Sequence, residues 1–226
     1  MSSRAPLASR QLFIATVAIL MLSWPMGVLA SEPKVPPGLD PGGVAIALLG
    51  DGVDYTKPEL AKRLARDGEG DLIAWDFVDN DIRPYAKAGQ STVDAEYIIS
   101  ASGAVSLVIV KEPAGNNAAA IGHMSTFVVR TPARIVAWPD GRPERVDWPV
   151  LFQAAQRFKD RLFIVPGPVR PEDAGKAGDN VIFAAPTQGL NDRAAVLSMA
   201  IAAAELLSKQ PQLPPADVKR FLIGKP

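Results

Sequence analysis

Residues that carry most protein chemistry are scarce in this chain of 226 residues. It contains no cysteine and a single histidine, His123. Without thiols there are no disulfides, no thiolate zinc sites and no cysteine nucleophiles. One imidazole excludes metal sites that need several histidines. It also leaves His123 as the only ordinary acid–base group that titrates near neutral pH.

Oxygen ligands do cluster in one stretch of the chain, which contains Asp76, Asp79, Asn80 and Asp81. Carboxylate and amide oxygens are the ligands that calcium prefers. Their spacing is not that of an EF-hand loop, so a solvated acidic turn is the favoured interpretation. We therefore expect no cofactor. Calcium binding by this stretch is possible, but no specific calcium-binding motif supports it.

The composition indicates one folded domain. Hydrophobic residues make up 48% of the chain and charged residues 21%, which suffices for a full core. Basic and acidic residues number 24 each. This balance argues against a nucleic-acid partner, whose binding draws on surplus positive charge.

The N-terminus has the pattern of a secretory signal peptide. Arg4 and Arg10 precede an apolar run, Leu12–Leu22, and a small-residue exit that ends at Ala30. We expect cleavage after Ala30, an extended segment over 31–42 and a folded domain over 43–226, in a secreted or periplasmic protein without a stable membrane span. The alternative is an uncleaved N-terminal anchor, because Leu12–Ala30 approaches spanning length.

Short apolar runs alternate with helical patterns along the rest of the chain. Runs that are apolar on both faces are typical of strands in a covered parallel sheet. They predict strands at Val44–Leu49, Val105–Val110, Arg134–Trp138, Leu162–Val165 and Val181–Ala185, with Leu72–Phe77 near an edge. Helices are predicted at Pro58–Arg66, Ala95–Ser102, Asn117–Val129, Val146–Asp160, Asn191–Lys209 and Pro215–Leu222. This order predicts an α/β fold with a doubly wound parallel sheet, in which the nearly all-apolar Asn191–Lys209 helix is buried on several sides.

Five segments, in the same order along the chain, resemble the subtilisin-like serine proteases (subtilases, peptidase family S8). They are VAIALLGDGVDYTKPEL (Val44–Leu60), WDFVDNDIRPY (Trp75–Tyr85), VSLVIVK (Val105–Lys111), ARIVAWPDG (Ala133–Gly141) and LLSKQPQLPPADVKRFL (Leu206–Leu222). The resemblance implies a subtilisin-like three-layer sandwich, here shortened. In the family, that fold supports a serine endopeptidase.

The family's catalytic positions do not match. The resemblance places Gly50 at the aspartate, Gln90 at the histidine and Arg193, within one residue, at the nucleophilic serine. Pro168 falls at the asparagine that helps to hold the oxyanion. Glutamine cannot relay a proton and arginine has no lone pair to attack a carbonyl, so the triad chemistry is lost.

Three residues could act as substitutes, and each has a simpler interpretation. Asp51 is next to the aspartate position, but alternation along a strand end points it elsewhere, as a turn residue. Ser198 lies in Leu-Ser-Met-Ala, which imitates a family motif, yet its place in the helix predicts a small interior residue. His123 lies outside the family's histidine helix and is expected to be a half-exposed packing residue.

We therefore predict a secreted or periplasmic subtilase-like pseudopeptidase that binds a protein or peptide. Gly50, Gln90, Pro168 and Arg193 should lie close together at the carboxyl ends of the strands, where Arg193 would favour an acidic peptide or carboxylate. The alternatives are an active peptidase with an atypical site that uses Ser198, and a gene product without a selected role.

Overall fold

A computed structural model describes residues 32–113, 118–141, 146–167, 175–186 and 191–224. Pro33–Pro226 forms one compact unit, in which residues 33–42 contain no helix or strand. The predicted signal peptide and Pro168 lie outside the described residues. Within the described part of the chain, no helix is long and apolar enough to cross a bilayer.

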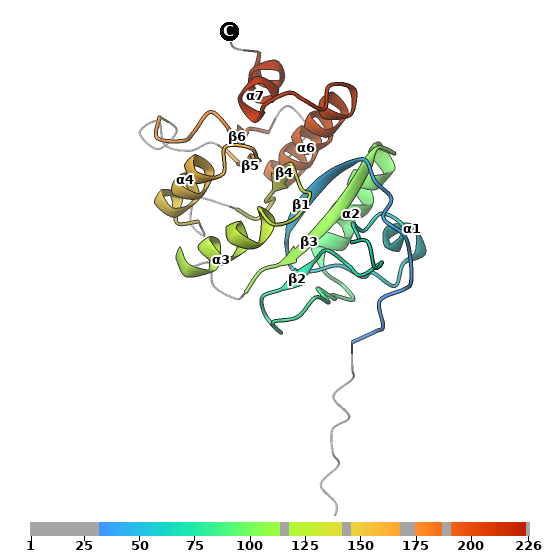
Figure 1. Ribbon diagram of the computed structural model, residues 1–226. Coiled ribbons are helices and arrows are strands. Elements are labelled where there is room, and N and C mark those ends of the chain that lie inside the picture. The colour runs from blue at the N-terminus through green and yellow to red at the C-terminus, as the bar shows by residue number, and fades with distance from the viewer. Residues whose placement is uncertain (1–31, 114–117, 142–145, 168–174, 187–190, 225–226) are drawn as a thin grey trace, which may run out of the picture. The chain divides into compact units, whose positions relative to one another are not determined.

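The predicted parallel sheet is confirmed. Among the described residues, six parallel strands lie in the order β2-β3-β1-β4-β5-β6, with β1 and β4 in the middle of the sheet (Figure 1). They span β1 (Val44–Gly50), β2 (Trp75–Asp76), β3 (Val105–Lys111), β4 (Ile135–Ala137), β5 (Leu162–Pro166) and β6 (Val181–Ala184). Only two residues of the expected strand Leu72–Phe77 pair as β2, and they do lie at an edge.

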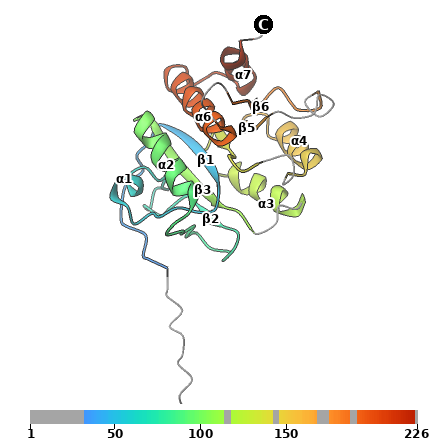
Figure 2. The same ribbon diagram turned by 180° about the vertical axis from the view of Figure 1, so that it is seen from behind.

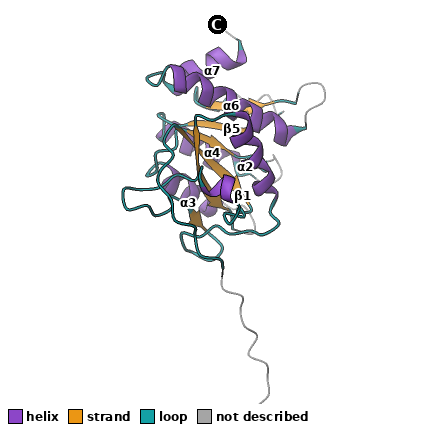
Figure 3. Cartoon of the chain, turned by 90° about the vertical axis from the view of Figure 1, so that its right-hand side faces the viewer, coloured by secondary structure: helices purple, strands orange, loops and turns teal. Residues whose placement is uncertain are grey.

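Helices cover both faces of the sheet, which gives three layers (Figures 2 and 3). They are α1 (Pro58–Ala61), α2 (Gln90–Ala101), α3 (Ala118–Val128), α4 (Trp148–Arg157), α6 (Asp192–Lys209) and α7 (Pro215–Ile223). Alternate residues of β1 show the division: Ile46 and Leu48 pack in one apolar cluster with α2 and α6, whereas Ala47 and Leu49 pack in the other with α3 and α4.

Helix α6 is the buried helix that its apolar pattern predicts. It packs against β1, β4, β5 and β6 of the sheet and against α2 and α7. Its alanines Ala200, Ala203 and Ala204 are fully buried. The Asn191 side chain caps the helix by accepting a hydrogen bond from the Ala194 N–H.

The prediction of one helix over Pro58–Arg66 is wrong beyond Ala61. From there the chain runs alongside β3 instead, where the Ala65 N–H donates to the Leu107 carbonyl and the Leu107 N–H donates to the Arg63 carbonyl. Leu64 and Ala65 then point to opposite apolar clusters. Pairing with the sheet and burial on both faces override helix propensity here.

Helix α2 begins earlier than predicted. Its first residue is Gln90, five residues before the expected start at Ala95. In contrast, α4 is shorter at both ends than the predicted Val146–Asp160. The early start of α2 matters most, because its first turn reaches the carboxyl edge of the sheet.

Candidate functional site

The carboxyl ends of the central strands meet the first turns of α2 and α6. The strand register aligns Asp76, Lys111 and Gly50 across β2, β3 and β1 at this edge. Gln90 opens α2, and Arg193 lies in the first turn of α6. The edge therefore holds Gly50, Gln90 and Arg193, the described residues that stand at the predicted triad positions.

Gly50 has no room for a side chain. A Cβ atom placed on it would lie 2.1 Å from the Ser91 Oγ atom, far inside the van der Waals limit. Ser91 is almost fully buried, and its hydroxyl accepts a hydrogen bond from the Asp51 N–H at 3.0 Å. The hydroxyl of Ser91 thus occupies the space into which an aspartate at position 50 would project.

Asp51 does more than the predicted turn residue would. Its two carboxylate oxygens accept hydrogen bonds from the backbone N–H groups of Gln90 and Ser91, both at 2.8 Å. These N–H groups have no partner within the helix, so Asp51 caps α2 from another element. Burial raises the pKa of Asp51, but the hydrogen bonds from Ser91 and Gln90 outweigh it and hold the pKa below the ordinary value.

Gln90 cannot accept and return a proton, because an amide side chain does not titrate near neutral pH. Its side-chain amide is 3.5 Å from a carboxylate oxygen of Asp94, one turn further along α2. Asp94 is only 2% exposed. Burial raises the pKa of Asp94 above its ordinary value, and the positive charge of Arg193 offsets only part of that rise.

Arg193 is not the free cation that the sequence predicts. Its guanidinium bridges two carboxylates, Asp94 of α2 and Asp140 of the loop that follows β4. Burial lowers the pKa of Arg193, but the two aspartates outweigh it and raise the pKa. Two negative charges surround one positive charge, so the expectation of a cationic site for an acidic ligand is wrong.

Beside this ion bridge the surface is hollowed. An open hollow of about 270 Å³ is lined by Gly50, Asp51, Val78, Lys111, Glu112, Pro113 and Asp140. Glu112 accepts a hydrogen bond from the Trp138 indole N–H at 2.6 Å, which ties the end of β3 to the end of β4. The hollow therefore has both apolar and charged lining residues, and hydrogen bonds and ion pairs hold its walls.

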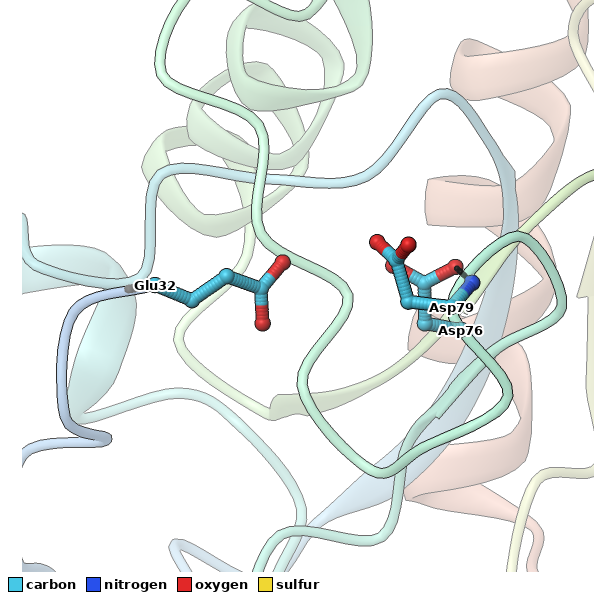
Figure 4. Close-up of side chains that lie close together, drawn as sticks. All are labelled: Glu32, Asp76 and Asp79. Carbon is cyan, nitrogen blue, oxygen red and sulfur yellow. Dashed lines mark hydrogen bonds between the residues drawn. The ribbon is translucent and has the colours of Figure 1, made fainter. Parts of the chain in front are cut away.

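The acidic turn pairs with the side-chain ammonium of Lys111, at the end of β3. The Lys111 ammonium lies 2.6 Å from one oxygen of the buried Asp76 carboxylate and 3.5 Å from Asp79. The other oxygen of Asp76 accepts the N–H groups of Val78 and Asp79, the latter drawn in Figure 4. Burial lowers the pKa of Lys111, but Asp76 and Asp79 outweigh it and raise the pKa. Lys111 thus supplies the positive charge for which calcium was considered.

The remaining residues of the acidic turn have local roles. Asn80 adopts the left-handed backbone conformation, with φ at 58°, which asparagine tolerates better than most residues. Asp81 forms an ion pair with Arg83 at 2.7 Å. Both residues therefore shape the turn.

Ser198 and His123 are not brought together. Ser198 is half-buried on α6, and its hydroxyl is 3.3 Å from the Tyr97 hydroxyl of α2. His123 lies on α3, which covers the opposite face of the sheet, and it is exposed instead of half-exposed. The sheet therefore separates the two residues that an atypical serine peptidase would need to combine.

The sequence pattern does not predict three of the residues that fill this site. Ser91, Asp94 and Asp140 provide the contacts, and two of them lie in the first turns of α2, which begins before the predicted start. Spacing could have revealed Asp94, since residues four apart share one face of a helix. Asp140 follows β4 in a loop, and no local pattern points it toward Arg193.

Comparison with solved structures supports the fold. The chain is similar to the structure titled "Crystal structure of a cold adapted subtilisin-like serine proteinase", with a TM-score of 0.50 and 13% sequence identity over 83% of this chain and 84% of that one. A scan against protein-family models and a search of the curated proteins each found no match. The fold is thus an α/β sandwich of the subtilisin-like type.

Gly50→Ala is expected to destabilise the protein by about 1–3 kcal/mol, because the new methyl group overlaps the Ser91 hydroxyl. Adding Gly50→Ala to Ser91→Gly should cost much less, because the hydroxyl is then absent. Urea denaturation of the four proteins measures this coupling. Gly122→Ala is the control: nothing lies within 4 Å of a Cβ there, so helix propensity should give a gain of about 0.5–1 kcal/mol. A Gly50→Ala protein as stable as the unaltered chain would contradict the packing argument.

Arg193→Met is expected to cost about 3–5 kcal/mol at pH 7, because it leaves the buried Asp94 carboxylate without its cation. The folded-state pKa of Asp94 then rises further above its unfolded value. Stability should therefore recover as the pH falls through that folded pKa, where Asp94 takes up a proton. Combining Arg193→Met with Asp94→Asn should restore most of the loss at pH 7.

Denaturation curves at pH 5 and pH 7 measure both effects. The matched control is Arg220→Met, which breaks an exposed pair with Asp217 on α7 and should cost less than about 1 kcal/mol. A loss for Arg193→Met as small as that for Arg220→Met, unchanged between the two pH values, would count against a structural role for the bridge.

Proposed function

We propose that this chain is a non-catalytic subtilase-like protein, a pseudopeptidase, that binds a protein or peptide outside the cytoplasm. The observation that carries the proposal is the occupied carboxyl edge. Ser91 fills the side-chain space at Gly50, and Asp94 and Asp140 enclose the guanidinium of Arg193. The space in which the family's chemistry would occur is taken by structural contacts.

Peptide hydrolysis by the family's mechanism requires a hydroxyl nucleophile and an imidazole that accepts and returns its proton. Gln90 does not titrate and Arg193 does not attack a carbonyl. Loss of a complete triad costs about 10⁶ in rate, or roughly 8 kcal/mol in the barrier. A scaffold with those losses is better suited to binding than to turnover.

The alternative peptidase, with Ser198 as nucleophile, gains nothing from its surroundings. The neighbour of the Ser198 hydroxyl is the Tyr97 hydroxyl, at 3.3 Å, and a phenol is not the imidazole that accepts the proton in the family's mechanism. His123 is on the other face of the sheet. We therefore retain the binding function as the proposal and treat serine chemistry as the outcome that would refute it.

The ligand would occupy the hollow beside the ion bridge. Val78, 54% exposed, gives this hollow an apolar contact, and the side chains of Asp51, Glu112 and Asp140 give it polar ones. Recognition of a peptide commonly combines such apolar and polar groups. The part of the proposal that places the protein outside the cytoplasm is based on the sequence pattern of Arg4, Arg10 and Leu12–Leu22.

A fluorophosphonate probe is expected to leave the protein unlabelled, because His123 lies on the other face of the sheet from Ser198 and cannot accept its proton. Mass spectrometry of the intact protein after exposure at high concentration measures this, with an active subtilisin as the positive control. Covalent labelling that disappears in Ser198→Ala would establish serine chemistry and refute the proposal.

A photo-crosslinking amino acid tests the binding site directly. Introduced at position 78, at the hollow, it should give a discrete crosslinked product in the extracytoplasmic fraction of the source cells. The matched control is position 221 on α7, where Phe221 is 65% exposed and lies on another element. Equal crosslinking from both positions, or none from position 78, would argue against a binding site at this edge.

A further inference from the structure

Asp76 and Lys111 face each other across the neighbouring strands β2 and β3. They are partners in the parallel register, and the Lys111 Nζ atom lies 2.6 Å from one carboxylate oxygen of Asp76, Oδ2. The Asp76 side chain has no exposed surface, and that of Lys111 is 16% exposed. The amine nitrogen of a lysine is therefore held against a carboxyl group in a place from which most water is excluded.

The other oxygen of Asp76, Oδ1, has its own partners. It accepts hydrogen bonds from the backbone N–H groups of Val78 at 2.7 Å and of Asp79 at 3.0 Å. Two donors at this distance stabilise the negative charge that develops on a carboxyl oxygen when its carbon is attacked. The Asp79 side chain adds a second carboxylate, 3.5 Å from the Lys111 Nζ atom. The group thus combines a nitrogen, an oxyanion site and a proton acceptor.

We propose that Lys111 and Asp76 join in an intramolecular amide bond, a modification that the chain carries out on itself. A proton first passes from the ammonium to Asp76 Oδ2, and rotation at the flexible end of the lysine brings the neutral amine over the carboxyl carbon, Cγ. The Nζ–Cγ bond then forms. Asp79 takes a second proton from Nζ and gives it to Oδ2, and the Cγ–Oδ2 bond breaks. One water leaves, one hydrogen stays on the amide nitrogen, and no oxidant or reductant is needed.

Proximity and burial favour this bond. Groups held in contact react as if at effective concentrations of about 10⁵–10⁸ M, which offsets the tendency of an amide to hydrolyse in water. An ion pair removed from water is costly, and the neutral amide abolishes both charges. Asp76 and Asp79 raise the pKa of Lys111, so the neutral amine is a minor form and the reaction is slow. A bond that forms once in each molecule tolerates a slow rate.

The amide would secure the shortest of the described strands. β2 contains two residues and lies at the edge of the sheet, where it pairs with β3 alone. The chain has no cysteine with which to form a disulfide. An amide between residues 35 positions apart restrains the unfolded chain in the way that a disulfide does.

Mass spectrometry of the intact full chain tests the proposal. After one week at pH 7, most molecules should be lighter by the mass of one water, and a digest should contain the Asp76 and Lys111 peptides joined to each other. Cyclisation at an Asp-Gly sequence such as Asp140-Gly141 also releases one water, but it joins no peptides. Lys111→Arg keeps the positive charge, lacks the amine and should give no joined peptide.

A second ion pair and one variant separate this chemistry from simple proximity. Lys57 and Glu96 also lie 2.6 Å apart, but their side chains are 45% and 43% exposed, so we expect no joined peptide from that pair. Asp79→Asn keeps the backbone N–H that binds Asp76 and removes the proton acceptor, so it should slow bond formation by about 10²-fold. A chain that keeps its full mass throughout, joins Lys57 to Glu96 as readily, or reacts as fast after Asp79→Asn would overturn the proposal.

Discussion

The guanidinium of Arg193, held between Asp94 and Asp140, is the interaction on which the carboxyl edge depends. It connects three elements that are far apart in the sequence: α2, the first turn of α6 and the loop after β4. A buried carboxylate such as Asp94 is costly without a cation, and the arginine is costly without its anions. Each group therefore requires the others, and the bridge connects three separate elements at the edge of the sheet.

The rest of the edge follows the same logic. Asp51 caps α2, Ser91 fills the space above Gly50, and Lys111 neutralises Asp76. At each place a charged or polar group that could do chemistry is instead used for a contact within the protein. This use of polar groups agrees with the binding role proposed above.

The sequence predicted the layers well and the site only in part. Long apolar runs such as Val105–Lys111 identify covered parallel strands, since few other structures bury both faces of a strand. The apolar Asn191–Lys209 segment likewise identified the buried helix. Prediction failed where a contact distant in sequence decides the outcome. The start of α2 depends on a cap supplied by Asp51, 39 residues earlier, and the charge state around Arg193 depends on Asp140, in a loop without a pattern. The end of α1 is similar, because β3 provides the pairing that stops the helix.

The overlap between position 50 and Ser91 has a consequence for the history of such a chain. An aspartate at position 50 would first collide with a hydroxyl that is itself bonded to the Asp51 N–H. Introduction of an aspartate at position 50 would thus require the serine to change beforehand, at the cost of that bond and with no immediate benefit. If the chain descends from a protease, mutation one residue at a time leads away from catalysis far more readily than back to it.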